Sequence, residues 1–89
     1  MAQSTYNAHV LVLRKTKLGE SDLILSLLAQ DGSQIRAVAK GARKPTSQFS
    51  SRLELYSQAD VLLAQGRSLD IVKEARLVAG NAALRESME

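Results

Sequence analysis

Five short apolar segments separated by turn residues constrain the fold of this chain more than any other feature of its sequence. They are rich in Val, Ile, Leu and Ala, and they are bounded by Gly, Ser, Asp and Gln. Segments of this length and composition are typical of β-strands, because helices need longer periodic runs. The predicted strands cover residues 9–13, 23–28, 34–42, 59–64 and 69–78. The sequence therefore predicts an all-β domain, in which the first strand is buried on both faces.

The clearest local signals lie around the third segment. Asp31-Gly32 precedes it and is a strong hairpin signal, since Gly accepts a positive φ. The segment itself alternates between apolar and polar positions, so its two faces can be separated. One face is predicted to hold Ile35, Ala37 and Ala39, and the other Arg36, Val38 and Lys40.

A longer connection rich in Ser, with Gly and the only Pro, separates the third and fourth segments. Five strands with such a connection suggest a small closed barrel, the five-stranded Greek-key arrangement of the OB-fold. An SH3-like barrel is the alternative. We assign residues 1–79 to the barrel. Residues 80–89 are predicted to begin a truncated C-terminal helical region, with Asn81 as a helix cap after Gly80.

Size and composition limit the class of protein. A chain of 89 residues forms one domain that buries only about 60% of its unfolded surface. There is no cysteine, which excludes disulfides and thiolate metal sites. No apolar run approaches the roughly 18 residues that span a bilayer, and the first residues do not resemble a signal peptide. We expect a cytoplasmic protein without membrane contacts.

The positive charge of the chain is concentrated in residues 34–53. That segment holds five basic residues and no acidic one: Arg36, Lys40, Arg43, Lys44 and Arg52. Residues 1–35 have three basic and three acidic groups, and residues 54–89 have four and six. A localised cationic surface is typical of a protein that binds a polyanion such as nucleic acid. The alternative is a set of ordinary solubilising charges.

Further candidates for nucleic-acid contacts are Arg14 and Arg67, each beside a predicted turn, and Phe49, which could stack on a base. A buried plug on the barrel is an equal alternative for Phe49. Tyr6 and Tyr56 are predicted in the core or at its rim. Arg36 and Lys40 are four residues apart on the third predicted strand, so they share a face and lie about 13 Å apart at roughly 3.3 Å per residue.

Catalysis and metal binding find no support in the sequence. The single His9 starts an apolar segment, and no nucleophile is indicated beside it. Residues 41–47 lack the Gly-Lys-Ser/Thr order of a phosphate-binding loop. Glu20 and Asp22 lie beside Gly and Ser, where turn formation explains them. We expect no enzyme activity, no cofactor, no metal and no small-molecule substrate.

Several separated motifs resemble one known family, that of the bacterial recombination mediator RecO, over about residues 6–78. They are Gly19–Leu25, Asp31-Gly32, Ala37–Lys44, Ser47, Phe49 and Gly66–Leu69. The stretch Ala39–Arg43 is the most specific of them. One departure lies at Leu55-Tyr56, where many members have Pro-Phe.

The resemblance implies an N-terminal OB-fold followed by a mostly helical part that often holds a cysteine cluster. Members of the family act without catalysis. They bind single- and double-stranded DNA and anneal complementary strands. With the mediator RecR, they help to displace single-strand binding protein so that the RecA recombinase can load. The residues alone do not distinguish DNA from RNA, and a protein-docking barrel is a further alternative.

Overall fold

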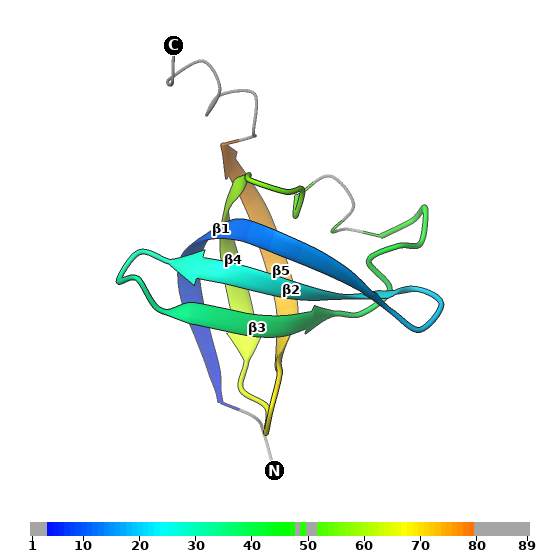
Figure 1. The fold of residues 1–89 in the computed structure, drawn as a ribbon, viewed down its shortest axis with the longest axis horizontal. Coiled ribbons are helices and arrows are strands. Elements are labelled where there is room, and N and C mark those ends of the chain that lie inside the picture. The colour runs from blue at the N-terminus through cyan, green and yellow to red at the C-terminus, as the bar shows by residue number, and fades with distance from the viewer. Residues whose placement is uncertain (1–3, 48, 50–51, 80–89) are drawn as a thin grey trace.

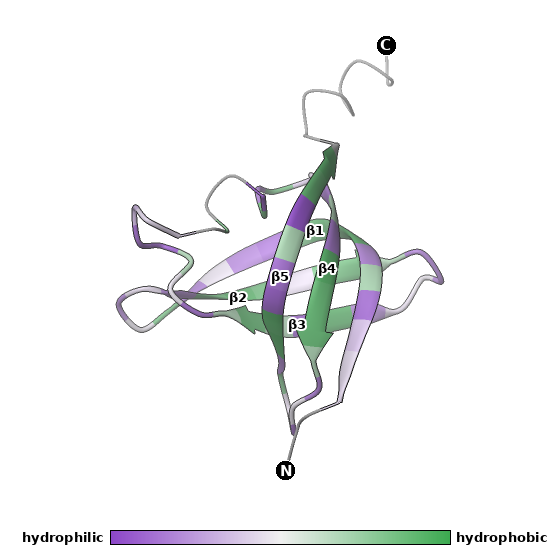
Figure 2. Cartoon of the chain, turned by 180° about the vertical axis from the view of Figure 1, so that it is seen from behind, coloured by the Kyte–Doolittle hydropathy of each residue, from purple (hydrophilic) through white to green (hydrophobic). Residues whose placement is uncertain are grey.

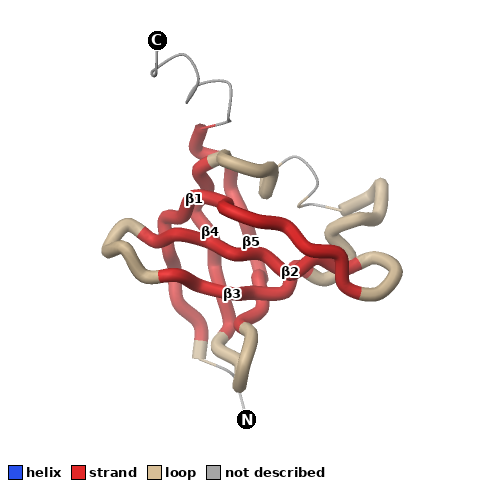
Figure 3. The backbone as a smooth tube through the Cα atoms, in the orientation of Figure 1, coloured by secondary structure: helices blue, strands red, loops and turns tan. Residues whose placement is uncertain are grey.

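The computed structural model describes residues 4–47, 49 and 52–79, and within them it consists of strands and loops (Figure 3). The strands are β1 (Thr5–Leu18), β2 (Asp22–Ala29), β3 (Gln34–Ala39), β4 (Gln58–Ala64) and β5 (Asp70–Ala79). The predicted helical region, residues 80–89, lies outside the described residues. Within the described range, no helix is long and apolar enough to cross a membrane.

The five strands form a closed barrel in the order β1-β2-β3-β5-β4. All neighbouring pairs are antiparallel except β3 and β5, which are parallel. Figure 1 shows β1, β2 and β3 crossing one side of the barrel, with β4 and β5 on the other. This arrangement confirms the predicted OB-fold, and the SH3-like alternative is not adopted.

β1 closes the barrel because it pairs with two strands. Its first part, Thr5–Leu11, pairs with β4, and its second part, Val10–Leu18, pairs with β2. The strand is much longer than predicted, since backbone pairing continues through polar residues at both ends. The prediction that it is buried on both faces is wrong. Val10 and Val12 are buried, but the outer face of a single-layer barrel leaves Leu11 and Leu13 only half-buried.

Inward-facing aliphatic side chains from all five strands fill the barrel. The fully buried aliphatic residues of the strands include Val10, Val12, Leu25, Leu27, Val61 and Leu63. They alternate with outward residues, as the burial of β2 and β4 shows. Figure 2 shows apolar and polar bands following one another along β5. Burial of each such side chain stabilises the fold by about 1.5–3 kcal/mol.

The hairpin between β2 and β3 is confirmed by backbone bonds from Ala29 N–H to the Ser33 carbonyl and from Gly32 N–H to the Ala29 carbonyl. In β3 the predicted inward residues Ala37 and Ala39 are buried. The strand ends at Ala39 rather than near residue 42, so Lys40 lies in a turn.

The early end of β3 has a local cause at Gly41. This residue has a φ of +70°, in the left-handed region that favours glycine. Its N–H donates to Asp22 Oδ1 at 2.7 Å rather than to a neighbouring strand. Lys40 therefore does not continue the exposed face of β3, and the extended spacing predicted between Arg36 and Lys40 does not apply.

Candidate nucleic-acid interface

Two arginines from separate strands meet in one row on the outside of the barrel. Arg14 of β1 lies opposite Ser26 of β2, and Ser26 lies opposite Arg36 of β3. Directly paired residues point to the same side of a sheet, and both arginines are exposed. Two interstrand steps place their Cα atoms about 10 Å apart. We call Arg14, Ser26 and Arg36 the arginine row.

A β-bulge directs Arg14 to the outside. Val12 is buried and pairs with Leu27, so strict alternation would turn Arg14 inward as well. The register shifts between Val12 and Arg14, which places one extra residue, Leu13, in β1. Arg14 then pairs with the outward Ser26. Bulges often re-aim a side chain at a binding site in this way.

Aliphatic side chains flank the arginine row on the same face. Thr16, Ile24, Val38 and Ile71 form the next row, from β1 to β5. Ile24, Val38 and Ile71 are half-buried, so part of each side chain is accessible. The outer face of β1, β2 and β3 therefore combines two cations with an apolar strip.

Three other predicted cations lie where the β3–β4 connection meets the β1–β2 turn. Lys40, Arg43 and Lys44 are all exposed. Arg43 fixes this junction in two ways. Its backbone N–H donates to the Ser21 carbonyl at 2.9 Å, and its Nη1 donates to the Gly19 carbonyl at 2.9 Å. The start of the β3–β4 connection is thereby attached beside the end of β1.

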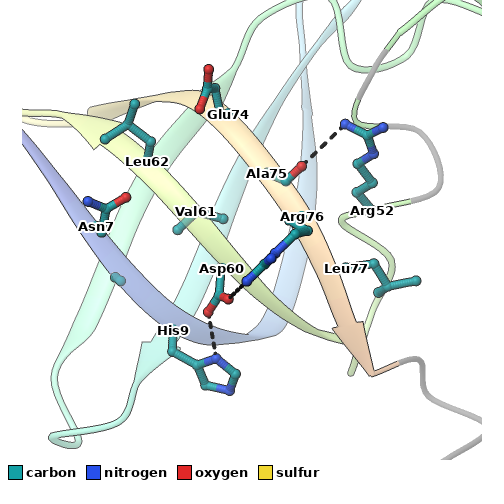
Figure 4. Close-up of a pocket in the computed structure, with 11 residues that line it drawn as sticks. Asn7, His9, Arg52, Asp60, Val61, Leu62, Glu74, Ala75, Arg76 and Leu77 are labelled. Atoms are coloured by element: carbon teal, nitrogen blue, oxygen red, sulfur yellow. Dashed lines mark hydrogen bonds and ion pairs between the residues drawn. The ribbon is translucent and has the colours of Figure 1, made fainter.

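The structure separates the remaining two cations from the arginine row. Arg52 Nη1 donates to the Ala75 carbonyl at 3.3 Å, which places this side chain against β5 (Figure 4). Arg67 lies exposed in the turn between β4 and β5. Of the basic residues predicted to bind nucleic acid, Arg14 and Arg36 share one row, and Arg52 belongs to another face.

That other face has a second row of three residues, in which the charges are paired. His9 of β1, Asp60 of β4 and Arg76 of β5 lie opposite one another. His9 Nδ1 donates to Asp60 Oδ1 at 2.8 Å, and Arg76 Nη2 donates to Asp60 Oδ2 at 2.8 Å (Figure 4). We call these residues the paired row. They line a cavity of about 970 Å³ together with Arg52 and Glu74.

The pairing is reflected in the acidity of these groups. The hydrogen bond from Arg76, and then that from His9, lowers the pKa of Asp60. The hydrogen bond to Asp60, and then the contact with Gln58, raises the pKa of His9. Each partner favours the charged form of the other, so the positive charge of this row is largely compensated by Asp60.

The two aromatic residues with open roles differ strongly in exposure. Phe49 is only 6% exposed and belongs to the core, in agreement with the plug alternative, so its ring is not offered to a base. Tyr56, predicted in the core or at the rim, is 55% exposed. Its φ of +63° is unusual for a residue with a bulky side chain. No sequence pattern indicated this exposure.

The backbone around Tyr56 is held firmly against β1. Its N–H donates to the Val12 carbonyl at 2.8 Å, and Val12 N–H donates to the Ser57 carbonyl at 3.0 Å. Tyr56 therefore lies in a segment whose backbone is bonded to β1 at Val12, which is two residues before Arg14. Residues in strained conformations cluster at functional sites, which makes Tyr56 a candidate for base stacking.

Two acidic residues have structural partners. Asp22 accepts the Gly41 N–H, and Asp70 accepts hydrogen bonds from the Tyr6 hydroxyl and from Gly66 N–H. Burial, followed by the bond to Asp70, raises the pKa of Tyr6 to about 12. Among the described residues, no three His, Cys, Asp or Glu side chains are grouped closely enough to hold a metal ion.

A closed five-stranded barrel with this strand order defines an OB-fold domain, a fold that often binds oligonucleotides or oligosaccharides. The family comparison agrees with this class. Residues 1–81 match the family model described as the N terminal of recombination protein O. The chain belongs to this family of DNA repair and recombination proteins.

Individual relatives are similar over most of the chain. A DNA repair protein RecO of Bifidobacterium longum is 49% identical over 80 residues, which are 90% of this chain and 34% of that protein. A protein of the same name from a Nocardioides species is 49% identical over 70 residues, 79% of this chain and 29% of the relative. The chain thus spans about a third of the length of the curated relatives that it matches.

Proposed function

We propose that this chain is the DNA-holding module of a recombinational repair mediator. It binds single- and double-stranded DNA through phosphate contacts, acts without catalysis, and holds strands for annealing. In the complete mediator, it works on cytoplasmic nucleoid DNA with a RecR-type partner, displacing single-strand binding protein so that RecA can load. Membership of the RecO family supports the repair setting.

The observation that supports DNA binding is the arginine row. Arg14 and Arg36 are exposed, point to the same side and flank a neutral serine. Arg guanidinium groups bind phosphate oxygens in bidentate geometry, and their separation of about 10 Å allows two phosphates of one strand to be contacted. Lys40, Arg43 and Lys44 extend the cationic surface beside the β1–β2 turn.

Base contacts come from two sources in this proposal. The half-buried Ile24 and Val38 offer an apolar strip beside the arginines, and Tyr56 offers an exposed ring from a segment whose backbone is bonded to β1 at Val12. Phosphate contacts position a strand without specifying its sequence. We therefore expect weak sequence preference and binding of duplex as well as single strands.

The test is fluorescence anisotropy of a labelled single strand, titrated at several salt concentrations. Arg14→Glu/Arg36→Glu is compared with Lys73→Glu/Arg76→Glu, which makes the same change of charge on β5. Loss of two phosphate contacts should reduce the slope of log affinity against log salt by about 1.4. The control should keep most of the wild-type slope and affinity.

Circular dichroism confirms that both variants are folded before binding is compared. Equal loss in the two variants would mean that net charge alone attracts DNA, and it would refute an interface at the arginine row. Unlabelled RNA of matched sequence is added as competitor. Stronger competition by RNA than by DNA would replace the proposed ligand with RNA.

A further inference from the structure

A second cationic site lies on the opposite side of β1 from the arginine row. Past the bulge at Leu13, Lys15 pairs with Leu25 and Lys17 pairs with Leu23. Both leucines are buried, so the two lysines point to the side of the sheet that forms the barrel interior. The inward positions of β1 thus change from Val10 and Val12 to lysine where the strand leaves the barrel.

Residues of the β3–β4 connection line an open cavity together with these lysines. The cavity has a volume of about 660 Å³, within the range of about 300–1,000 Å³ typical of small-ligand sites. Leu23, Ala42 and Phe49, which are buried, and Leu55, which is 40% exposed, supply an apolar lining. Phe49 therefore contributes to a wall here although its ring is not free to stack at the surface.

The charge of this cavity is unbalanced. Lys15, Lys17 and Arg43 line it, against a single carboxylate on Glu54. The ion pairs found in the described part of the chain both involve Asp60, so neither lysine is neutralised by a carboxylate within that part. The Arg43 side chain is fixed at this cavity by its bond to the Gly19 carbonyl.

We propose that this cavity is a mononucleotide subsite, which takes one unstacked nucleotide of a single strand. The phosphate contacts Lys15, Lys17 and Arg43, and the base packs against the apolar lining, including the exposed part of Leu55. A simple anion would make no contact with the apolar lining. An apolar ligand would offer no negative charge to Lys15, Lys17 and Arg43. The proposal deepens the DNA-binding function proposed above and rests on it for the nature of the ligand.

The test is a titration of the isotope-labelled chain with deoxyadenosine 5′-monophosphate, followed by amide chemical shifts in NMR spectra. We expect shifts at Leu23, Ala42 and Leu55, with an affinity that falls as salt is added. Deoxyadenosine and inorganic phosphate, each lacking half of the ligand, should bind at least about fivefold more weakly. Equal shifts with phosphate alone would identify a simple anion site and overturn the proposal.

Three variants sharpen this experiment. Lys15→Glu/Lys17→Glu should weaken mononucleotide binding at least about tenfold, while Lys73→Glu, at an exposed residue outside the cavity lining, should leave it unchanged. Glu54→Gln removes the one carboxylate and should strengthen binding about two- to threefold. The opposite sign for Glu54→Gln would refute the assigned phosphate position, even if the lysine variant had lost its fold.

Arg14→Glu/Arg36→Glu distinguishes this proposal from the one on which it rests. If both are correct, this variant loses affinity for a long single strand but keeps the mononucleotide shifts at the cavity. If the mononucleotide shifts residues of the arginine row instead, the cavity is not the subsite. An acidic peptide that displaces the mononucleotide and binds more tightly would make the cavity a protein-docking site.

Discussion

Two rows of three residues lie across the outside of this barrel, and they differ mainly at the central position. Arg14, Ser26 and Arg36 form the arginine row, while His9, Asp60 and Arg76 form the paired row. In the paired row a carboxylate compensates both neighbours at 2.8 Å. In the arginine row a neutral serine compensates neither. The comparison teaches that the central residue, rather than the number of cations, decides how far the positive charge of a row is compensated, which favours the arginine row as the proposed DNA-binding face.

The largest effect is expected from making the arginine row resemble the paired row. Ser26→Asp places a carboxylate between Arg14 and Arg36 without removing a cation. The new ion pairs should lower single-strand affinity about tenfold, or about 1.4 kcal/mol, measured by fluorescence anisotropy. Ser26→Asn, of matched size but neutral, is the control. An affinity unchanged in Ser26→Asp would show that the row does not contact phosphate.

A smaller effect is expected at Tyr56, which separates base contacts from phosphate contacts. Tyr56→Gly removes the ring, and glycine accepts the φ of +63° without strain. Loss of one stacked base, taken at the lower end of the range of about 1–3 kcal/mol, should weaken single-strand binding about fivefold. The free energy of unfolding in a urea titration should not fall by more than about 1 kcal/mol.

Tyr56→Asn provides the matched control, because asparagine also tolerates the left-handed region but has no aromatic ring. The two variants should bind alike. If single-strand binding survives in both, Tyr56 is not a stacking residue, and its conformation has another cause.

The smallest effect is expected from removing the carboxylate at the centre of the paired row. Asp60→Asn frees Arg76 and His9 and should raise single-strand affinity about two- to threefold, since exposed ion pairs are weak. It should also lower the pKa of His9 toward its ordinary value of about 6.5. Anisotropy measures the first effect, and NMR titration of the His9 ring measures the second. An unchanged His9 pKa would contradict the hydrogen bond to Asp60.

This pairing gives stability a defined dependence on pH. The folded-state pKa of His9 is raised, so its contribution is complete below about pH 6.5 and is lost as pH rises through the raised value. The pKa of Asp60 is lowered, so its contribution is lost only as pH falls through that depressed value. Wild-type Tm should therefore fall more than that of Asp60→Asn between about pH 6 and about pH 8.

Much of the fold could be predicted from the residues. The alternation of Ile35, Ala37 and Ala39 fixed the inner face of β3, and Asp31-Gly32 marked its hairpin. The end of β3 could not be predicted, because it depends on a bond between Gly41 and Asp22, a residue distant in the sequence. The length of β1 was missed for a similar reason, since its polar ends are held by partners on two other strands.

The candidate site could be predicted only in part. The concentration of charge in residues 34–53 pointed to a polyanion, but it treated Arg36 and Arg52 as one group. Arg52 lies against β5. Arg36 instead shares the arginine row with Arg14, which lies outside residues 34–53. Burial and exposure of the aromatics could not be read from composition, because Phe49 and Tyr56 lie in connections without periodicity.

The sequence by itself determined the all-β class, the five strands, the inward aliphatic positions and the local excess of positive charge. These follow from side-chain polarity at a period of two, which is a local property. Only the tertiary structure decided which cations share a surface. The extra residue at Leu13 turns Arg14 outward and Lys15 inward, and strand register then brings Arg14 level with Arg36. Register depends on pairing between distant segments, and a single bulge reverses the face of every residue after it.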